Sequence, residues 1–285
     1  MVDEAAPVLV ASSQSRGPEL RDAIWNGPLS LVERASLAAA LTCNESAPLK
    51  WLSNWWANAV VGHVVSSLCD ARLRVSGVEH IERLAPSGGV LLAANHRTFF
   101  DLFAVAYAFR NHTRLCRGVY FPVRSHFWYD HPLGPWVNVL GTGMNMFPPV
   151  FRASHKREVT RRGLDWLAQR LGQPGVVVGM HPEGTRSRGA DPFALLPPEQ
   201  SFGRVALLSR ATIVPAFVHG LSDSIWNEVR RRKQRDAVVD IAFGAPVNSG
   251  EFDDCDPRRL RNQLGIGERV LQSIHALALD VHARR

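Results

Sequence analysis

Short apolar runs alternate with helical stretches along this chain, and that alternation constrains the fold more than any other feature of the sequence. Residues 89–94 (GVLLAA) and 175–179 (GVVVG) contain no polar side chain, which is typical of strands buried on both faces of a sheet. We expect strands at 73–78, 89–94, 119–123, 175–179, 211–218 and 237–243, and helices at 29–41, 102–110, 154–171 and 201–210. The pattern predicts an α/β fold, a single layered domain with a central mixed, mostly parallel sheet flanked by helices.

The size and composition of the chain agree with one globular domain that carries an extension. The 285 residues are 46% hydrophobic and 21% charged, which allows a large core. We therefore expect a folded chain and not a disordered one. We expect an N-terminal helical extension over residues 1–70 and the main domain over residues 71–285. Asp256 is expected to open a C-terminal helical region, with Pro257 in its first helical position.

The remaining compositional features concern the compartment. The four cysteines show no CxxC spacing, so we expect reduced thiols in a cytosolic protein. Residues 1–4 (MVDE) lack the basic start of a secretory signal, and none is expected.

The surplus of basic residues predicts a polyanionic partner. The formal net charge is +7, and the isoelectric point is near 9.8. Nucleic acid, an anionic membrane face or a phosphorylated substrate would each suit this charge. We recognise no nucleic-acid-binding module, so nucleic acid is not expected as a partner. Residues 229–235 (VRRRKQR) are a basic run that suits either contact with anionic lipid or a solvated loop.

Residues 51–69 (WLSNWWANAVVGHVVSSLC) form an uncharged segment with an unusual composition. Asparagine, glycine, histidine and serine dilute its hydrophobicity, and its length is barely enough for a bilayer-spanning helix. Three tryptophans gather at its start, and indole rings favour the headgroup level of a membrane. Its polarity favours two interpretations over a true bilayer span, which stays open as the third. The segment is a helix lying in the membrane interface, or a helix packed on the main domain.

Polar side chains follow the first buried strand abruptly. Residues 95–101 (NHRTFFD) come directly after the 89–94 run, and α/β folds keep their sites at the ends of buried strands. His96 can act as a general base, and Asp101 can fix its tautomer and stabilise the imidazolium. This is also compatible with a loop histidine of purely structural role. His275 and Asp280 have the same spacing but lie in the predicted C-terminal helix, where the five-residue step separates their side chains, so we treat them as a chance pair.

A second polar cluster follows the second buried strand. Residues 179–188 (GMHPEGTRSR) come after the valine run. Gly184 permits backbone geometry that other residues avoid, and Arg186 offers a planar fork for phosphate or carboxylate. Glu183 can accept hydrogen bonds from hydroxyl groups or hold the arginine. A surface turn with a salt bridge is the simpler alternative for this cluster taken by itself.

Together the two clusters resemble motifs of the glycerolipid acyltransferases, the family that includes lysophosphatidic acid acyltransferases. Residues 95–101 match that family's NHx4D motif, and residues 182–187 match its FPEGTRS motif, with His181 in the place of the usual phenylalanine. Residues 213–216 (IVPA) are similar to its later hydrophobic-proline motif. The resemblance covers about residues 75–243, most of the chain.

The resemblance implies roles for individual residues. His96 and Asp101 would be the catalytic pair, with His96 as the general base. The residues implied in substrate binding are Asn95, Arg97, Arg124, Glu183, Gly184, Thr185 and Arg186. No metal and no cofactor is implied, because acyl-CoA or acyl carrier protein would serve as co-substrate.

One stretch departs from the family's pattern. The family usually carries an arginine that helps to hold glycerol phosphate, after a glycine and an apolar stretch between the two motifs. Residues 141–149 (GTGMNMFPP) contain none; Arg152 is the nearest, beyond two prolines, and Arg124 lies well upstream. The acceptor is therefore left open among glycerol phosphates, lysophospholipids, glycolipids and other hydroxylated lipids.

The reaction that the resemblance implies is transfer of a fatty acyl group from a thioester to a lipid hydroxyl. The implied partners are a membrane lipid surface, acyl-CoA and acyl carrier protein, and the implied location is the cytoplasmic face of a membrane, as a peripheral or monotopic protein. Two alternatives remain. They are CoA-independent transacylation between phospholipids, and an inactive membrane-binding relative, against which the intact His96, Asp101 and Glu183 argue.

Overall fold

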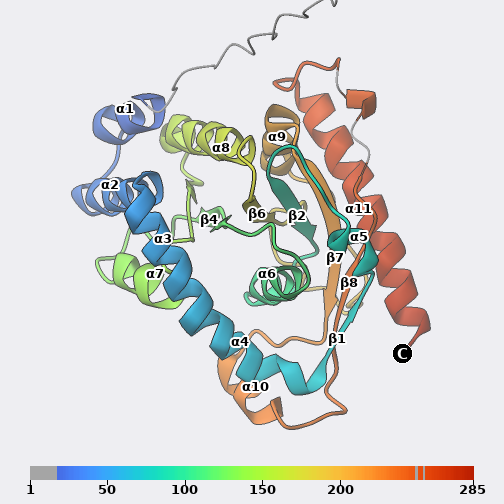
Figure 1. The fold of residues 1–285 in the computed structure, drawn as a ribbon. Helices are drawn as coiled ribbons and strands as arrows, with labels where there is room; N and C mark the ends of the chain where they lie inside the picture. The colour runs from blue at the N-terminus through green and yellow to red at the C-terminus, as the bar shows by residue number, and fades with distance from the viewer. Residues whose placement is uncertain (1–17, 248–249, 253) are drawn as a thin grey trace, which may run out of the picture.

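A computed structural model describes residues 18–247, 250–252 and 254–285, and it shows a six-stranded sheet between two layers of helices (Figure 1). The strand order is β1-β8-β7-β2-β6-β3. The strands are β1 (Leu73–Ser76), β2 (Val90–Ala94), β3 (Gly118–Tyr120), β6 (Val176–Met180), β7 (Thr212–His219) and β8 (Val239–Phe243). A separate two-stranded sheet joins β4 (Val123–Arg124) to β5 (Pro149–Val150).

The sheet is mixed and mostly parallel, as predicted. Strands β3, β6, β2 and β7 pair in parallel, β8 is antiparallel to β7, and β1 is parallel to β8. Both strands that lack polar side chains, β2 and β6, are fully buried and are neighbours in the interior of the sheet. Their position explains the composition, because a strand covered by helices on both faces alternates between two apolar environments.

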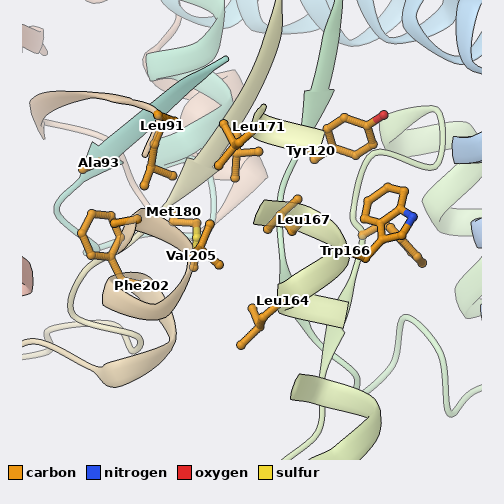
Figure 2. Close-up of a cluster of buried hydrophobic side chains, with 14 of the residues drawn as sticks. Leu91, Ala93, Tyr120, Leu164, Trp166, Leu167, Leu171, Met180, Phe202 and Val205 are labelled. Atoms are coloured by element: carbon orange, nitrogen blue, oxygen red, sulfur yellow. The ribbon is translucent and has the colours of Figure 1, made fainter. Parts of the chain in front are cut away.

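Successive side chains of a strand point to opposite faces of the sheet and pack into two separate hydrophobic cores. Leu91 and Ala93 face a cluster formed with α8 (Arg157–Leu171), α9 (Gln200–Ser209) and α11 (Leu260–Ala283). Val90 and Leu92 face a second cluster formed with α5 (Glu79–Glu82) and α6 (Asp101–His112). Figure 2 shows part of the first cluster, in which β2 and β6 meet α8 and α9: Leu91, Ala93, Met180, Leu164, Leu167, Leu171, Phe202 and Val205.

The remaining helices include three short elements that sequence reasoning did not anticipate. These are α1 (Pro18–Asn26), α7 (Gly134–Thr142) and α10 (Ile225–Arg231). The helix expected at 29–41 is present as α2 (Leu31–Glu45), and a capping box between Ser30 and Glu33 fixes its start. The helix expected at 154–171 begins with a 3-10 turn (Ser154–Lys156) before α8.

Two boundaries differ from the prediction. The single strand expected at 119–123 is split into β3 and β4, which belong to different sheets. Pro122 stands between them and has no N–H to donate to a ladder. The C-terminal helix begins at Leu260 instead of near Pro257, because Asp256 caps a turn by accepting the N–H groups of Arg258 and Arg259.

The uncharged segment 51–69 belongs to one long helical run along the edge of the sheet. It consists of α3 (Ala47–Trp56), a π-helical stretch (Ala57–Val61) and α4 (Gly62–Cys69). The Asn54 side chain donates to Arg117 O beside β3, so α3 covers the edge strand of the sheet. In the part of the chain that the structure describes, no helix combines the length and apolarity needed to cross a membrane.

A buried lysine joins α3 to the sheet and to the loop after α7. Lys50 Nζ donates to Asn44 Oδ1 at 2.9 Å, Val119 O at 3.0 Å and Asn145 Oδ1 at 2.7 Å. It also lies 3.7 Å from the centre of the Tyr120 ring. Burial lowers the pKa of this amine to about 7. The cost of that burial is offset by these three hydrogen bonds, since a buried amine without them would lose its water and gain no partner.

Replacing Lys50 by methionine is expected to lower the free energy of unfolding by about 3 kcal/mol, since the stem is kept while buried oxygens lose their donor. Urea unfolding followed by circular dichroism measures the change. Lys233→Met, at an exposed lysine, is the matched control and should change the free energy by less than about 0.5 kcal/mol. Equal stability of the two variants would contradict the role given to Lys50.

Candidate active site

The polar segments that follow β2, β6 and β7 lie at one edge of the sheet. These strands are parallel neighbours, so their carboxyl ends point the same way. The N–H of Ser187 donates to His96 O at 2.8 Å, which joins the loop after β6 to the loop after β2. The fold therefore brings together the two motifs that the sequence separates by more than eighty residues.

Asp101 organises the loop that carries His96. Its buried carboxylate accepts the N–H groups of Arg97 at 2.6 Å and Thr98 at 2.7 Å, and the Thr98 hydroxyl at 2.6 Å. The same group lies 3.5 Å from His96 Nδ1. With the proton on Nδ1, that contact orients the ring and leaves the lone pair on Nε2. The pair has the arrangement of a base and its orienting carboxylate.

Asn95 fastens the start of this loop to β7. Its side-chain nitrogen donates to Val218 O at 2.9 Å, and its oxygen accepts the N–H of Val218 at 2.7 Å. The amide thus imitates a strand neighbour and is almost completely buried. We interpret Asn95 as a residue that positions His96, since both the oxygen and the nitrogen of its side-chain amide are already hydrogen-bonded within the protein.

Glu183 also positions the loop. Its Oε1 accepts the N–H of His96 at 2.8 Å, and its Oε2 accepts the N–H of Leu196 at 2.6 Å. The side chain is 3% exposed, and burial raises the pKa of the carboxyl although the two N–H groups oppose the shift. Both oxygens therefore face backbone donors rather than a bound hydroxyl.

His181 stacks on His96. The two rings are 3.7 Å apart between centroids and 7° from parallel, and the Nδ1 of His181 lies 2.9 Å from Ala94 O. Burial, with the neighbouring His96, holds the pKa of His181 well below its ordinary range. The carbonyl contact places the proton of the neutral ring on Nδ1. The residue that replaces the usual phenylalanine keeps an aromatic face against the His96 ring.

A pH dependence of stability follows from the lowered pKa of this half-buried ring. The unfolded chain protonates His181 below about pH 6.5, while the folded chain does not, so the free energy of unfolding should fall as pH is lowered, by up to about 1.4 kcal/mol per unit. His181→Phe should show a smaller fall between pH 7.5 and 5.5 in urea unfolding. Identical falls in the two proteins would contradict the lowered pKa.

Three arginines gather beside the turn of the second motif. Gly184 adopts a left-handed φ of +61°, and a Cβ there would meet the Glu199 side chain at 2.7 Å. Arg124 Nη2 donates to Thr185 Oγ1 at 2.9 Å across this turn. Burial lowers the pKa of Arg124, and the charges of Arg152 and Arg186 lower it further. The cluster is a set of like charges that an anion would neutralise.

Arg152 is a residue that sequence reasoning set aside. Strand β5 pairs in parallel with β4, which brings the chain after two prolines back beside Arg124. Asp223 was also missed. It accepts a hydrogen bond from Arg186 Nη1 at 2.9 Å and the N–H of Phe99 at 2.9 Å. Its position after β7, at the same sheet edge as the two motifs, is the signal that could have pointed to it.

Arg97 lies at the same edge and contacts neutral oxygens. Its guanidinium donates to Ser187 Oγ at 3.1 Å, Asp191 O at 3.0 Å and Gly189 O at 3.0 Å. His275 and Asp280 lie on α11, and both are exposed. Among the described residues, no group of three or more histidine, cysteine or acidic side chains is placed to hold a metal ion.

An apolar cavity of about 490 Å³ begins beside the loop that carries His96, residues 95–101. Phe99 and Phe100 of that loop form part of its wall, and Phe127, Trp128 and Leu221 lie in the same wall. The remainder of the lining comes from the π-helical stretch, α4, α6, α7 and α10: Val61, Val64, Val65, Leu68, Cys69, Phe103, Ala104, Val137, Gly141, Thr142, Ile225 and Glu228. The volume lies in the range of small-molecule sites, and the lining suits a hydrocarbon chain.

Comparison with known proteins gives a family model, described as Acyltransferase, that matches residues 72–219. A search of curated proteins finds no match. Among solved structures, the chain is similar to the crystal structure of the 1-acyl-sn-glycerophosphate (LPA) acyltransferase, PlsC, from Thermotoga maritima. The similarity has a TM-score of 0.51 at 16% identity and covers 88% of each chain. At this identity it shows a shared fold.

Proposed function

The chain belongs to the Acyltransferase family, and on that premise we propose that it moves a fatty acyl group from acyl-CoA or acyl carrier protein to a hydroxyl of a lysophospholipid or glycerol-phosphate-type acceptor. The observation that carries this proposal is the His96–Asp101 pair on a loop with contacts to both candidate subsites: its Phe99 and Phe100 line the apolar cavity, and the N–H of Phe99 shares Asp223 with Arg186. An acyl donor needs the cavity and a phosphorylated acceptor needs the arginines.

The proposed reaction uses His96 as the base. Its Nε2 removes the acceptor's hydroxyl proton as the oxygen attacks the thioester carbonyl, and Asp101 stabilises the imidazolium. The new C–O bond forms, the C–S bond breaks, and the leaving thiolate takes the proton from His96. No protein nucleophile is required. A positioned base of this kind contributes about 10²–10⁴ to the rate.

The acceptor site is proposed at Arg124, Arg152 and Arg186. A phosphate there would receive charge-assisted hydrogen bonds, and its charge would oppose both the burial and the neighbouring arginines that lower the pKa of Arg124. Thr185 and the left-handed turn at Gly184 hold Arg124 in place. This arrangement favours a glycerol phosphate or lysophospholipid over an uncharged glycolipid. The apolar cavity beside Phe99 and Phe100 is proposed to hold the acyl chain.

We also propose that the protein works on the cytoplasmic face of a membrane, as a peripheral or monotopic protein. Trp51, Trp136 and Trp226 are between 66% and 71% exposed and lie on α3, α7 and α10. Residues 51–69 and 132–151 carry no formal charge, and the Trp56 indole donates to Leu140 O, so α3 and α7 are neighbours. Exposed Val64, Val137 and Ile225 belong to the same surface and to the lining of the cavity.

The membrane proposal predicts vesicle binding that depends on these indoles. A Trp136→Ser, Trp226→Ser double variant should bind vesicles of phosphatidylcholine and phosphatidylglycerol about tenfold more weakly than the wild type, because buried apolar area is lost. Cosedimentation measures the affinity. Trp25→Ser, at an exposed tryptophan of α1, is the control. Absence of vesicle binding by the wild type, or an equal loss in the control, would contradict the proposal.

The direct test of the proposed function is an acyl transfer assay. Purified protein in detergent or vesicles receives long-chain acyl-CoA or acyl carrier protein, with glycerol 3-phosphate, lysophosphatidic acid, other lysophospholipids and glycolipids as acceptors. Mass spectrometry follows the acylated product. Product from a phosphorylated acceptor, reduced in Arg124→Ala and Arg152→Ala through a raised KM, is expected. Product from a phospholipid donor without a thioester would favour transacylation, and no product from any combination would favour an inactive relative.

A further inference from the structure

A second, polar groove opens on the other side of the loop that carries His96 (residues 95–101), here called the catalytic loop. It has a volume of about 390 Å³ and lies at the carboxyl ends of β2 and β7. Its walls come from the loop after β2, the loop after β6, the loop after β7 and the end of α10. The basic and polar side chains that line it include Arg97, Arg188, His219 and Arg231. Apart from Leu221, which also lines the apolar cavity, its lining residues differ from those of the cavity, and it contains none of the three arginines of the proposed acceptor site.

The groove carries positive charge that carboxylates in its wall do not neutralise. Arg97 donates to a hydroxyl and two backbone carbonyls and to no carboxylate among the described residues. Arg188 is exposed and has no ion-pair partner within the described part of the chain. Of the two acids in the wall, Asp101 is bonded to the loop's own N–H groups, and Asp223 is paired with Arg186.

Arg231 adds a third guanidinium at the far wall. Its Nη1 is 3.9 Å from Glu228 Oε1, but Glu228 is committed elsewhere: it forms a buried ion pair with Arg72 and accepts the N–H of Ser222 at 2.7 Å. The groove is therefore suited to an anionic ligand with more than one charge, or to a phosphate held by several arginines.

The catalytic loop separates the groove from the apolar cavity and contributes residues to both. Thr98 and Asp101 line the groove, Phe99 and Phe100 line the cavity, and Leu221 lines both. A thioester donor has the matching form, because its reacting carbonyl joins a hydrocarbon chain on one side to a phosphorylated carrier on the other. With the chain in the cavity and the carrier in the groove, the carbonyl lies at the loop that carries His96.

Resting on the proposed function, we propose that this groove binds the phosphorylated pantetheine arm of the thioester donor, with Arg188 and Arg231 as its phosphate ligands. The same phosphate occurs in coenzyme A and in acyl carrier protein, so the groove accepts the chemistry common to both. The donor's phosphate and the acceptor's phosphate then occupy two separate basic sites, the first at Arg188 and Arg231 and the second at Arg124, Arg152 and Arg186, and each site can be changed without the other.

The test compares donors with and without the phosphate. Steady-state kinetics use palmitoyl-CoA, palmitoyl acyl carrier protein and palmitoyl-pantetheine, which has the same thioester and no phosphate. Arg188→Ala and Arg231→Ala should each raise KM for the two phosphorylated donors about tenfold, because a charge-assisted bond to phosphate is lost. The KM for palmitoyl-pantetheine and for the acceptor should stay within twofold, as should kcat. Arg83→Ala, at an exposed arginine before β2, is the matched control.

Each outcome decides the matter. Equal increases in KM for palmitoyl-CoA and palmitoyl-pantetheine, or an increase for the acceptor alone, would overturn the assignment. The phosphorylated donor with the lower KM in the wild type identifies the source of the arm. If the wild type transfers no acyl group at all, the proposed function fails, and calorimetry with coenzyme A tests the groove separately. Binding that both variants weaken supports the site, and no binding refutes it.

Discussion

His96→Ala is expected to lower kcat for acyl transfer by about 10³, the midpoint of the contribution of a positioned general base. The Nε2 of His96 is the atom that takes the acceptor's proton in the proposed reaction, and Asp101 fixes the ring through Nδ1. The stacked His181 offers no substitute, because its Nδ1 proton is hydrogen-bonded to Ala94 O and its ring is packed against His96. Product formation in the acyl transfer assay, at saturating donor and acceptor, gives the measurement.

A control for this prediction is present in the chain. His275→Ala removes a histidine that also precedes an aspartate by five residues, but on the exposed part of α11, and it should leave kcat unchanged. Asp101→Asn should also lower kcat strongly, because an amide no longer stabilises the imidazolium and also meets backbone N–H groups with a donor. Retention of more than a tenth of the wild-type kcat in His96→Ala would refute the assignment of the base.

The arrangement of the sheet could be predicted because its signal is local. The two runs without polar residues, 89–94 and 175–179, are the central strands β2 and β6, and each motif follows the carboxyl end of its strand. Parallel pairing then requires the two motifs to meet at one edge. The helices α8, α9 and α11 were also expected, since each has a clear apolar stripe that faces the sheet.

Other elements depend on contacts that a sequence pattern does not record. Helix α7 has the sequence GPWVNVLGT, and its glycines and proline read as a loop. The helix ends at Thr142, and the next residue, Gly143, has a φ of +63°. A Cβ built on Gly143 would lie 2.4 Å from Ser53 O, so only glycine fits this position. The two-residue pairing of β4 with β5, which places Arg152 beside Arg124, is too short to leave a periodicity.

Roles within the candidate site were harder to foresee than its location. The residue types of the two motifs indicated where chemistry would occur, but Asn95 and Glu183 read as ligands for a substrate. In the structure, each uses both of its polar atoms on backbone groups of the protein. A carboxylate or amide near a site can equally support the neighbouring loop, and the hydrogen-bond partners that decide this come from distant parts of the chain.

Glu183→Gln is therefore expected to reduce kcat by about 10²-fold without contact between residue 183 and the substrate. A glutamine has one accepting oxygen and one donating nitrogen, so either His96 N–H or Leu196 N–H faces another donor. The loss of an accepting partner at a buried N–H also costs about 1–3 kcal/mol of stability. A shift of the His96 backbone by a fraction of an ångström is enough for a loss of this size, because catalytic geometry tolerates little displacement.

The kinetic pattern separates this supporting role from direct binding. If Glu183 holds the loop, Glu183→Gln lowers kcat and leaves KM for the acceptor within about threefold, because the contacts that bind the acceptor in the ground state are unchanged. If Glu183 binds the acceptor, KM rises and kcat is nearly kept. Glu268→Gln, at an exposed glutamate of α11, controls for loss of charge and should match the wild type in both constants and in urea unfolding. A raised acceptor KM in Glu183→Gln, with the stability unchanged, would return Glu183 to the role of a substrate ligand.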